Sequence, residues 1–393
     1  MGRQRRLTII GAGLPGAAYP NATHTIAALR DEGGWEIDDR AAWLPEGTHL
    51  WRVLSAPWRE RLVLGVRLSM GSLWSLMRCV GRADFAYAPY PSIFVLWWAS
   101  WIPRRWRPRI VADAFISIWD TTARDRGLTD QHSVASRMLL RFESRALRAA
   151  HRVVVDTVAN RDWMIACMGL DPTRVFALPL AIDARPLLAI PARQRKHGDP
   201  LRVLFIGTLV PLHGIARIAA AVELLAGEPG IVFEFIADGR EAGVLEALAG
   251  RPAGSMMAWR RQWASLSELC ERIGSADVCL GVFGGDGKAS RVLPFKVYMA
   301  LAAGRAVLTQ WYLSLPGASP APPLAMSEPT PEAIRDALLR LRDQPEQVEE
   351  RSRAGREYFV RHLGPGRLAA FWEAMLAGDP PGRPTAPTGP EAD

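Results

Sequence analysis

Short apolar runs rich in β-branched residues alternate along the chain with longer stretches in which apolar residues recur every three or four positions. The short runs predict strands and the longer stretches predict helices. We expect strands at residues 7–10, 84–88, 109–114, 152–156, 175–178, 203–206, 232–237, 278–283 and 306–308. The clearest helical patterns cover residues 133–150, 331–342, 346–361 and 367–376. This alternation predicts an α/β fold with parallel sheets.

The segment 189–200 (AIPARQRKHGDP) is polar and flanked by prolines, which is typical of a linker. We therefore expect two Rossmann-like domains, at residues 1–188 and 200–362. A helix follows them at residues 363–376. Residues 377–393 are rich in proline and glycine, which predicts a disordered tail.

Composition narrows the class of protein. Of the 393 residues, 49% are hydrophobic and 22% are charged, a globular balance that excludes a disordered or fibrous protein. The four cysteines are scattered without a CxxC pair, which argues against a disulfide framework or a zinc site and favours a reducing compartment. The longest apolar run, residues 93–102, is about half of what a membrane span needs, and the N-terminus lacks the long apolar segment of a signal peptide. We therefore expect a cytoplasmic protein without a metal site.

The positive charge is confined to the first half of the chain. Residues 1–185 hold 25 arginines, no lysine and 17 acidic residues, whereas the remainder holds 23 basic and 23 acidic residues. Eleven of the 15 tryptophans also lie in the first half. Arginine beside tryptophan suggests a surface that meets anionic lipid or a polyanion; an arginine-rich composition with a tryptophan-rich core is the alternative. The charge forms no known nucleic-acid-binding module, so we expect no nucleic-acid partner.

The first predicted strand is followed by GAGLPG, which ends at Gly16 and has the GxGxxG spacing of dinucleotide sites. Such a site also needs a helix directly after the glycines and an acidic residue about 20 positions on, close to Asp38. Pro15 and Pro20 interrupt the glycine turn and that helix. The sequence therefore favours a flexible loop, with Gly13 and Gly16, that lines a cleft between the domains. A dinucleotide site and a structural turn are the alternatives.

A second glycine turn, FIGTLVPLHG, contains Gly207, Thr208 and His213. It follows a predicted strand and precedes a helix, so its backbone N–H groups lie where anions bind at the carboxyl ends of parallel strands. A structural turn and a phosphate site are equally consistent with this pattern.

A third glycine-rich segment, GGDGKASRVLPFKVYMALAAG, carries Lys288, Arg291 and Lys296. Only three of the 48 basic residues are lysines, and two of them lie here. A compact ammonium group in an arginine-biased chain suggests a phosphate site. A solvated basic loop is the alternative.

The segment DAFISIWDT places Asp113 and Asp120 directly after another predicted strand. Carboxylates and hydroxyls at the carboxyl end of a parallel strand lie where α/β proteins bind ligands. Helix capping by Asp120 or Thr121 is the alternative.

Together and in this order, these segments resemble GT-B glycosyltransferases, specifically the family-4 retaining enzymes. GTLVPLHG is similar to their strand-to-helix G-x-L-x-x-x-x-G turn, and FEFIADG to their mid-domain strand that ends in glycine. ADVCLGVFG followed by FKVYMALAAGRAVLT resembles their donor-binding segment. The resemblance covers residues 200–310 well and residues 1–185 more loosely.

The chain also departs from that family. The family usually has an arginine and a lysine on the donor diphosphate where this chain has Thr208 and His213. Its two glutamates, eight positions apart, are replaced by Arg291 and Met299, and the histidine that commonly follows the N-domain strand is absent. We expect the phosphate-binding charge to have moved to the basic residues of the third glycine-rich segment.

The resemblance implies two domains that face each other across a cleft, with the last helix packing back on the first domain and no cofactor or metal. It implies a retaining hexosyltransferase that moves a sugar from a nucleotide-diphospho-sugar to a saccharide or lipid-linked acceptor. Synthesis of a cell-surface polysaccharide or glycolipid is the expected pathway. An NAD- or FAD-dependent oxidoreductase that uses GAGLPG, or a non-catalytic or epimerase-type GT-B protein, is the alternative.

The same resemblance assigns roles to residues. The donor would lie on the second domain, at Gly207, Thr208, His213, Lys288, Arg291, Lys296 and Val297. Asp113 or Asp120 would lie near the reacting hydroxyl of the acceptor. The tryptophan- and arginine-rich segment 97–107 would suit a lipid-linked acceptor, with the protein peripheral on the inner face of the plasma membrane. A buried helix at residues 93–102 is the alternative.

Overall fold

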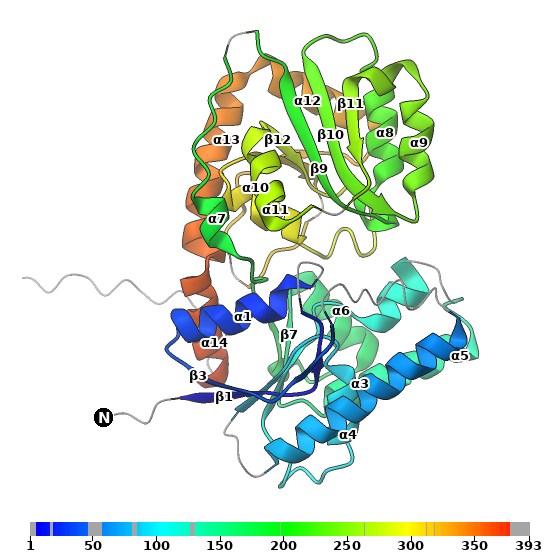
Figure 1. Ribbon diagram of the computed structural model, residues 1–393, viewed down its shortest axis with the longest axis vertical. Helices are drawn as coiled ribbons and strands as arrows, with labels where there is room; N and C mark the ends of the chain where they lie inside the picture. Colours follow the sequence, from blue (N-terminus) through cyan, green and yellow to red (C-terminus); the bar gives the residue numbers. More distant parts are fainter. Residues whose placement is uncertain are drawn as a thin grey trace, which may run out of the picture.

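The computed structural model describes residues 5–15, 19–45, 57–80, 85–125, 130–196, 198–262, 264–311, 313–317 and 319–377. Two six-stranded parallel sheets form its framework, one in each half of the chain (Figure 1). The first sheet has the strand order β3-β1-β5-β6-β7-β8 and the second the order β11-β10-β9-β12-β13-β14. A small sheet pairs β2 with β4. The strands are β1 (Arg6–Ile9), β2 (Ala12–Gly13), β3 (Glu36–Asp39), β4 (Ala42–Trp43), β5 (Phe85–Ala88), β6 (Ile110–Asp113), β7 (Arg152–Val155), β8 (Val175–Ala177), β9 (Leu201–Leu209), β10 (Ile231–Gly239), β11 (Met257–Arg260), β12 (Val278–Leu280), β13 (Ala306–Gln310) and β14 (Ala325–Ser327).

Helices cover both faces of each sheet (Figure 1). They are α1 (Pro20–Asp31), α3 (Trp58–Cys79), α4 (Ile93–Ala99), α5 (Val134–Arg148), α6 (Val158–Met168), α7 (Ala184–Leu188), α8 (Ile215–Leu224), α9 (Ala242–Ala249), α10 (Leu266–Ser275), α11 (Phe295–Ala302), α12 (Pro331–Asp343), α13 (Pro345–Tyr358) and α14 (Pro365–Ala377). Two short π-helical segments span Asp120–Asp125 and Phe359–Leu363. Because both faces are covered, the central strand β6 buries all four of its residues, which are apolar except for Asp113 at its end.

Each predicted strand overlaps a strand of the structure, and the α/β fold is confirmed. The sequence did not predict β3, β11 and β14, which are edge strands, or the two-residue strands β2 and β4. The edge strand β3 (EIDD) buries none of its side chains. Such a segment forms a strand because the neighbouring strand has free backbone hydrogen-bonding groups. Its own side chains lack the apolar pattern that predicts a strand.

Two connections join the halves. Near the segment 189–200, the buried Arg305 guanidinium donates hydrogen bonds to the carbonyl oxygens of Pro191, Ile273, Gly274, Ala303 and Gly304. The second connection leads from α13 to α14, which lies beside α1 on the first half (Figure 1). There Trp372 packs edge-to-face on Tyr87, with 5.2 Å between ring centroids. No helix in the described ranges is both long and apolar enough to cross a bilayer.

Candidate functional site

Loops at the carboxyl ends of the two sheets contact each other. The N–H of Val158, just beyond β7, donates to the carbonyl of Leu315 (2.9 Å), and the N–H of Leu180, beyond β8, donates to the Tyr298 hydroxyl (3.3 Å). Phe115, beyond β6, packs against Phe295 at the start of α11. Ligands of parallel α/β proteins bind at this edge of the sheet, so the surfaces around these contacts form the candidate site.

One group of predicted site residues meets across this contact. Arg291 Nη2 lies 3.0 Å from Asp120 Oδ2, and its guanidinium lies 4.0 Å from the ring centroid of Trp163. Lys288 Nζ donates to the Thr121 hydroxyl at 2.8 Å. The structure thus joins Asp120 from the first half to Lys288 and Arg291 from the second. The Asp120 and Arg291 side chains are 4% and 12% exposed, so this ion pair is largely shielded from water.

A buried glutamate fixes the loop that carries Asp120. The Glu143 carboxylate accepts hydrogen bonds from the N–H groups of Ile118 (2.9 Å) and Trp119 (2.8 Å) and from the Ser117 hydroxyl (3.1 Å). Burial raises the pKa of Glu143 to about 7. This positioning residue was not predicted from the sequence. Its sequence signal is a carboxylate on the buried face of α5, next to Ser144, Ala146 and Leu147.

Lys296 forms a separate second site. Its Nζ lies 3.8 Å from the ring centroid of Phe205, and this nitrogen is buried with no hydrogen-bond partner among the residues that the structure describes. Burial lowers the pKa of Lys296 well below its usual value. Burial and the nearby Lys296 charge also lower the pKa of His213. A buried cation without a counter-charge is unfavourable, so an anion beside this amine would favour its charged form.

The end of β9 and the turn that follows it lie next to this amine. Gly207 has φ +147°, and a Cβ built there would lie 3.0 Å from the His213 ring and 3.4 Å from Lys296 Nζ. His213 Nδ1 bonds to the Thr208 carbonyl, which ties the two ends of the turn together. The structure therefore brings together Gly207, Thr208, His213 and Lys296.

The glycine-rich loop after β12 is anchored by residues that the sequence analysis did not single out. Gln310 exchanges two hydrogen bonds with the backbone of Gly285, at 2.8 and 2.9 Å. Arg217 donates to the Phe283 carbonyl at 2.6 Å. Val297 is fully buried in the core, and its N–H donates to the Pro294 carbonyl, so this residue packs α11 rather than facing the site.

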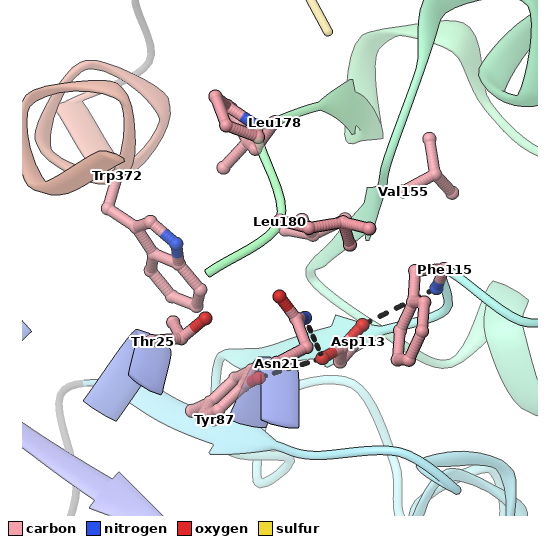
Figure 2. A pocket seen from close by; sticks show the side chains of 11 residues that line it. Asn21, Thr25, Tyr87, Asp113, Phe115, Val155, Leu178, Leu180 and Trp372 are labelled. Carbon is pink, nitrogen blue, oxygen red and sulfur yellow. Dashed lines mark hydrogen bonds between the residues drawn. The ribbon is translucent and has the colours of Figure 1, made fainter. Parts of the chain in front are cut away.

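Asp113 lies in an enclosed cavity beneath α14 (Figure 2). Its Oδ2 accepts hydrogen bonds from Asn21 Nδ2 (2.8 Å) and the Tyr87 hydroxyl (2.9 Å), and the side chains of Leu180 and Trp372 close the space above. The cavity volume is about 10 Å³, room for one water molecule. Burial raises the pKa of Asp113 to about 6. The structure does not bring Asp113 to Asp120 or to the basic residues.

The GAGLPG segment does not have the geometry of a dinucleotide fingerprint. After Gly11 the chain enters β2, and α1 begins only at Pro20, whereas a dinucleotide site requires a helix directly after the glycines. A Cβ on Gly13 would lie 2.4 Å from the Trp43 ring, so this glycine permits close packing. Gly16 lies outside the described residues. In the part of the chain that is described, no group of three or more His, Cys, Asp or Glu side chains is placed to hold a metal ion.

Sequence comparisons with protein-family models and with curated proteins give no match. Comparison with solved structures finds an E. coli trehalose-6-phosphate protein bound with UDP-2-fluoro glucose, with a TM-score of 0.66, 14% identity, and coverage of 94% of this chain and 98% of that chain. Sucrose-phosphate synthase from Thermosynechococcus elongatus has a TM-score of 0.60 and 15% identity, over 95% and 98% of the chains. HepE from Anabaena, in complex with UDP, has a TM-score of 0.63 and 10% identity, over 95% and 100%. The fold that the sequence predicted is confirmed: the chain has two Rossmann-like halves in the GT-B arrangement.

Proposed function

We propose that this protein is a glycosyltransferase that moves a sugar from a nucleotide-diphospho-sugar to a saccharide or lipid-linked acceptor. The observation that carries the proposal is the buried Lys296 amine, which has no hydrogen-bond partner in the described part of the chain and lies beside Gly207 at the end of β9. In a GT-B fold this turn lies at the carboxyl edge of the second sheet. A donor diphosphate there would give Lys296 the counter-charge that it lacks.

On the donor side, charge develops on the leaving diphosphate as the bond to the sugar breaks, and positive groups already in place stabilise it. Lys296 would meet one phosphate, together with the backbone of Gly207 and Thr208. Lys288 and Arg291 would reach the diphosphate by exchanging their present contacts with Thr121 and Asp120. UDP is the first nucleotide to test, because similar structures contain UDP or a UDP-sugar.

On the acceptor side, we assign Asp120 to the reacting hydroxyl. It lies at the contact between the halves, opposite Arg291, and Glu143 fixes its loop. Asp113 is 1% exposed and already holds Asn21 and Tyr87, so it acts as a positioning residue for α1 and β5. Retention of configuration, and a place in cell-surface polysaccharide or glycolipid synthesis at the inner face of the plasma membrane, belong to the same proposal.

Lys296→Ala tests the donor site. We expect it to weaken UDP binding by about 1.5–3 kcal/mol, the contribution of a charged hydrogen bond, while uridine binding hardly changes. The matched control is Lys196→Ala, which removes an exposed lysine of the linker. Calorimetric titration of both variants with UDP and uridine measures the difference. An equal loss for nucleoside and nucleotide would contradict the assignment, and so would an equal effect of the control.

A further inference from the structure

Helix α3 presents its more apolar face to solvent. Its buried residues include two serines, Ser72 and Ser75. On the other side, seven large apolar side chains are 52–63% exposed: Trp58, Leu62, Val63, Val66, Met70, Trp74 and Met77. Most of them recur at helical spacing, so they form one continuous band, the α3 stripe. A contiguous apolar surface of this kind marks a contact with a partner or a membrane.

The stripe continues onto neighbouring elements. α4 lies beside both α3 and α5, so the three helices form one layer on the outside of the first half (Figure 1). Trp101 and Trp106, after α4, are 62% and 58% exposed. Val134 and Met138, in the first two turns of α5, are each 64% exposed. We call this surface, with the α3 stripe, the outer layer.

The outer layer is strongly basic. Residues 58–79, 93–109 and 134–148 contain twelve arginines: Arg59, Arg61, Arg67, Arg78, Arg104, Arg105, Arg107, Arg109, Arg137, Arg141, Arg145 and Arg148. The same ranges contain only two carboxylates, Glu60 and Glu143, and Glu143 is buried against backbone N–H groups. Among the described residues, none of the twelve forms an ion pair with a carboxylate. The surface therefore presents uncompensated positive charge next to apolar side chains.

The tryptophans at the start of the segment 97–107 do not face outward as its composition suggested. Trp97 packs against Phe142, with 4.6 Å between ring centroids, and the Trp98 indole N–H donates to the Ser69 carbonyl at 3.0 Å. Both are partly buried and pack against the core of the first half. The exposed apolar surface comes mainly from α3, which the sequence analysis did not single out.

We propose that the outer layer docks on a lipid bilayer that carries anionic headgroups, with α3 lying in the interface between headgroups and acyl chains. An apolar face with tryptophan, flanked by arginine, is the composition of helices that lie in this interface. Anionic lipid also supplies the negative charge that the twelve arginines lack. A second copy of the chain is a poorer occupant, because it would bring the same positive charge against itself.

Helix α3 is connected by hydrogen bonds to the loops near the candidate site. The Ser75 hydroxyl of α3 accepts a hydrogen bond from the N–H of Gly11 (3.0 Å) and donates one to the Arg40 carbonyl (2.7 Å). The helix on the bilayer is thus bonded to the glycine loop at the carboxyl end of β1. This brings the first half to a lipid-linked acceptor, an inference that rests on the proposed function; vesicle binding itself requires no donor or acceptor.

Sedimentation with vesicles tests the proposal. We expect the protein to bind vesicles of phosphatidylglycerol and phosphatidylcholine at least ~10-fold more strongly than pure phosphatidylcholine at low salt, and ~0.5 M salt to remove most of this preference. The double variant Val66→Glu with Met70→Glu should bind at least ~10-fold more weakly, because charge replaces inserted apolar groups. Val360→Glu is the matched control: its side chain is 57% exposed in the second half, and its binding should be unchanged.

Replacement of Arg59, Arg67, Arg137 and Arg141 by Gln should remove the preference for anionic lipid, and circular dichroism should show all variants folded. Failure of the wild-type protein to bind anionic vesicles at low salt would overturn the proposal, as would wild-type binding by the glutamate variant. A concentration-dependent dimer in light scattering that the glutamate variant abolishes, without vesicle binding, would assign the stripe to a second copy instead. UDP titration of the free protein tests the donor site separately. A protein that fails to bind vesicles can therefore still bind UDP, and the two proposals are distinguished.

Discussion

At Lys296 an amine lies against the Phe205 ring with no hydrogen-bond partner, and at Asp113 a carboxylate lies in a cavity large enough for one water molecule. Burial favours the uncharged form of each group, so it lowers the pKa of Lys296 and raises the pKa of Asp113. The two side chains differ in their partners. Asp113 accepts hydrogen bonds from Asn21 and Tyr87, whereas the Lys296 amine has no hydrogen-bond partner among the described residues. We therefore expect Lys296 to affect proton uptake on ligand binding, and Asp113 to affect the pH dependence of stability.

Binding of UDP should take up a proton through Lys296. Burial lowers the pKa of this amine, and a diphosphate beside it would raise the pKa again, so the amine gains a proton when the nucleotide binds. The binding enthalpy measured near neutral pH should then depend on the ionisation enthalpy of the buffer. Lys296→Met should reduce this dependence. Equal enthalpies for the wild-type protein in PIPES and Tris buffers would contradict the prediction.

Asp113 should make the protein less stable as pH rises. Its pKa is about 6 in the folded state, against 3.8 for the free group, so between these values the folded protein holds a proton that the unfolded chain has released. Stability is then lost as pH rises from about 4 to 6, by about 3 kcal/mol in total. Asp113→Asn, which cannot ionise, should flatten this part of the profile. Chemical denaturation across this range measures it, and parallel profiles for the two proteins would be the contrary result.

Local patterns predicted the glycine turns and the positions of most strands along the chain, because both depend on neighbouring residues. The surroundings of Asp113 could not be predicted in this way, since Asn21, Tyr87 and Trp372 reach it from three distant elements. The separation of Lys296 from Lys288 and Arg291 could not be predicted either, because it depends on where α11 begins and on which distant elements each side chain contacts. The sequence places these cations on one segment, but α11 begins at Phe295 and directs Lys296 toward β9, while the loop before it reaches the first half.

At the scale of elements, the loop after β6 and the glycine-rich loop after β12 form the polar contact between the halves. Asp120 and Arg291 are its charged pair, and the Trp163 ring of α6 supports the guanidinium. The pair is largely buried, so removal of one partner leaves the other charge without compensation. This makes the contact a place where a donor diphosphate would compete with Asp120 for the same arginine.

A double-mutant cycle should show this coupling. Asp120→Asn and Arg291→Gln should each destabilise the protein, whereas the double variant should lose less than the sum by about 1–3 kcal/mol. Denaturant unfolding measures the stabilities. As a control, the cycle for the exposed pair Arg353 and Glu357 should give a coupling below about 1 kcal/mol. Additive effects at Asp120 and Arg291 would show that the pair does not join the halves.

At the scale of the whole molecule, the loops at the carboxyl ends of the two parallel sheets contact each other, at the edge where α/β proteins bind ligands. The alternative site at GAGLPG lacks the helix that would receive a pyrophosphate, because β2 follows Gly11. The two interpretations therefore differ in which ligand stabilises the folded chain, and a ligand that binds only the native state raises the melting temperature.

Nucleoside diphosphates should raise the melting temperature, and NAD and FAD should not. A nucleotide at 100 times its Kd contributes about 2.7 kcal/mol, enough for a shift of a few degrees. A thermal-shift screen with UDP, GDP, dTDP, ADP, NAD and FAD measures this, with uridine as the control for the phosphates. A flavin that co-purifies in equal amount with the protein would favour an oxidoreductase and leave the fold unchanged.

The position of α14 sets an order of events during synthesis. This helix packs Leu368, Trp372 and Met375 into the same core as Leu7 and Ile9, although the whole second half is translated between them. Domains usually fold as they leave the ribosome, first the N-terminal one. Here the second half can fold before the core of the first half is complete. The missing side chains come from α14, which is available only after translation has passed residue 377. The part of the protein that is made first is therefore the part that is finished last, and until then its apolar interior is exposed to chaperones and to other nascent chains.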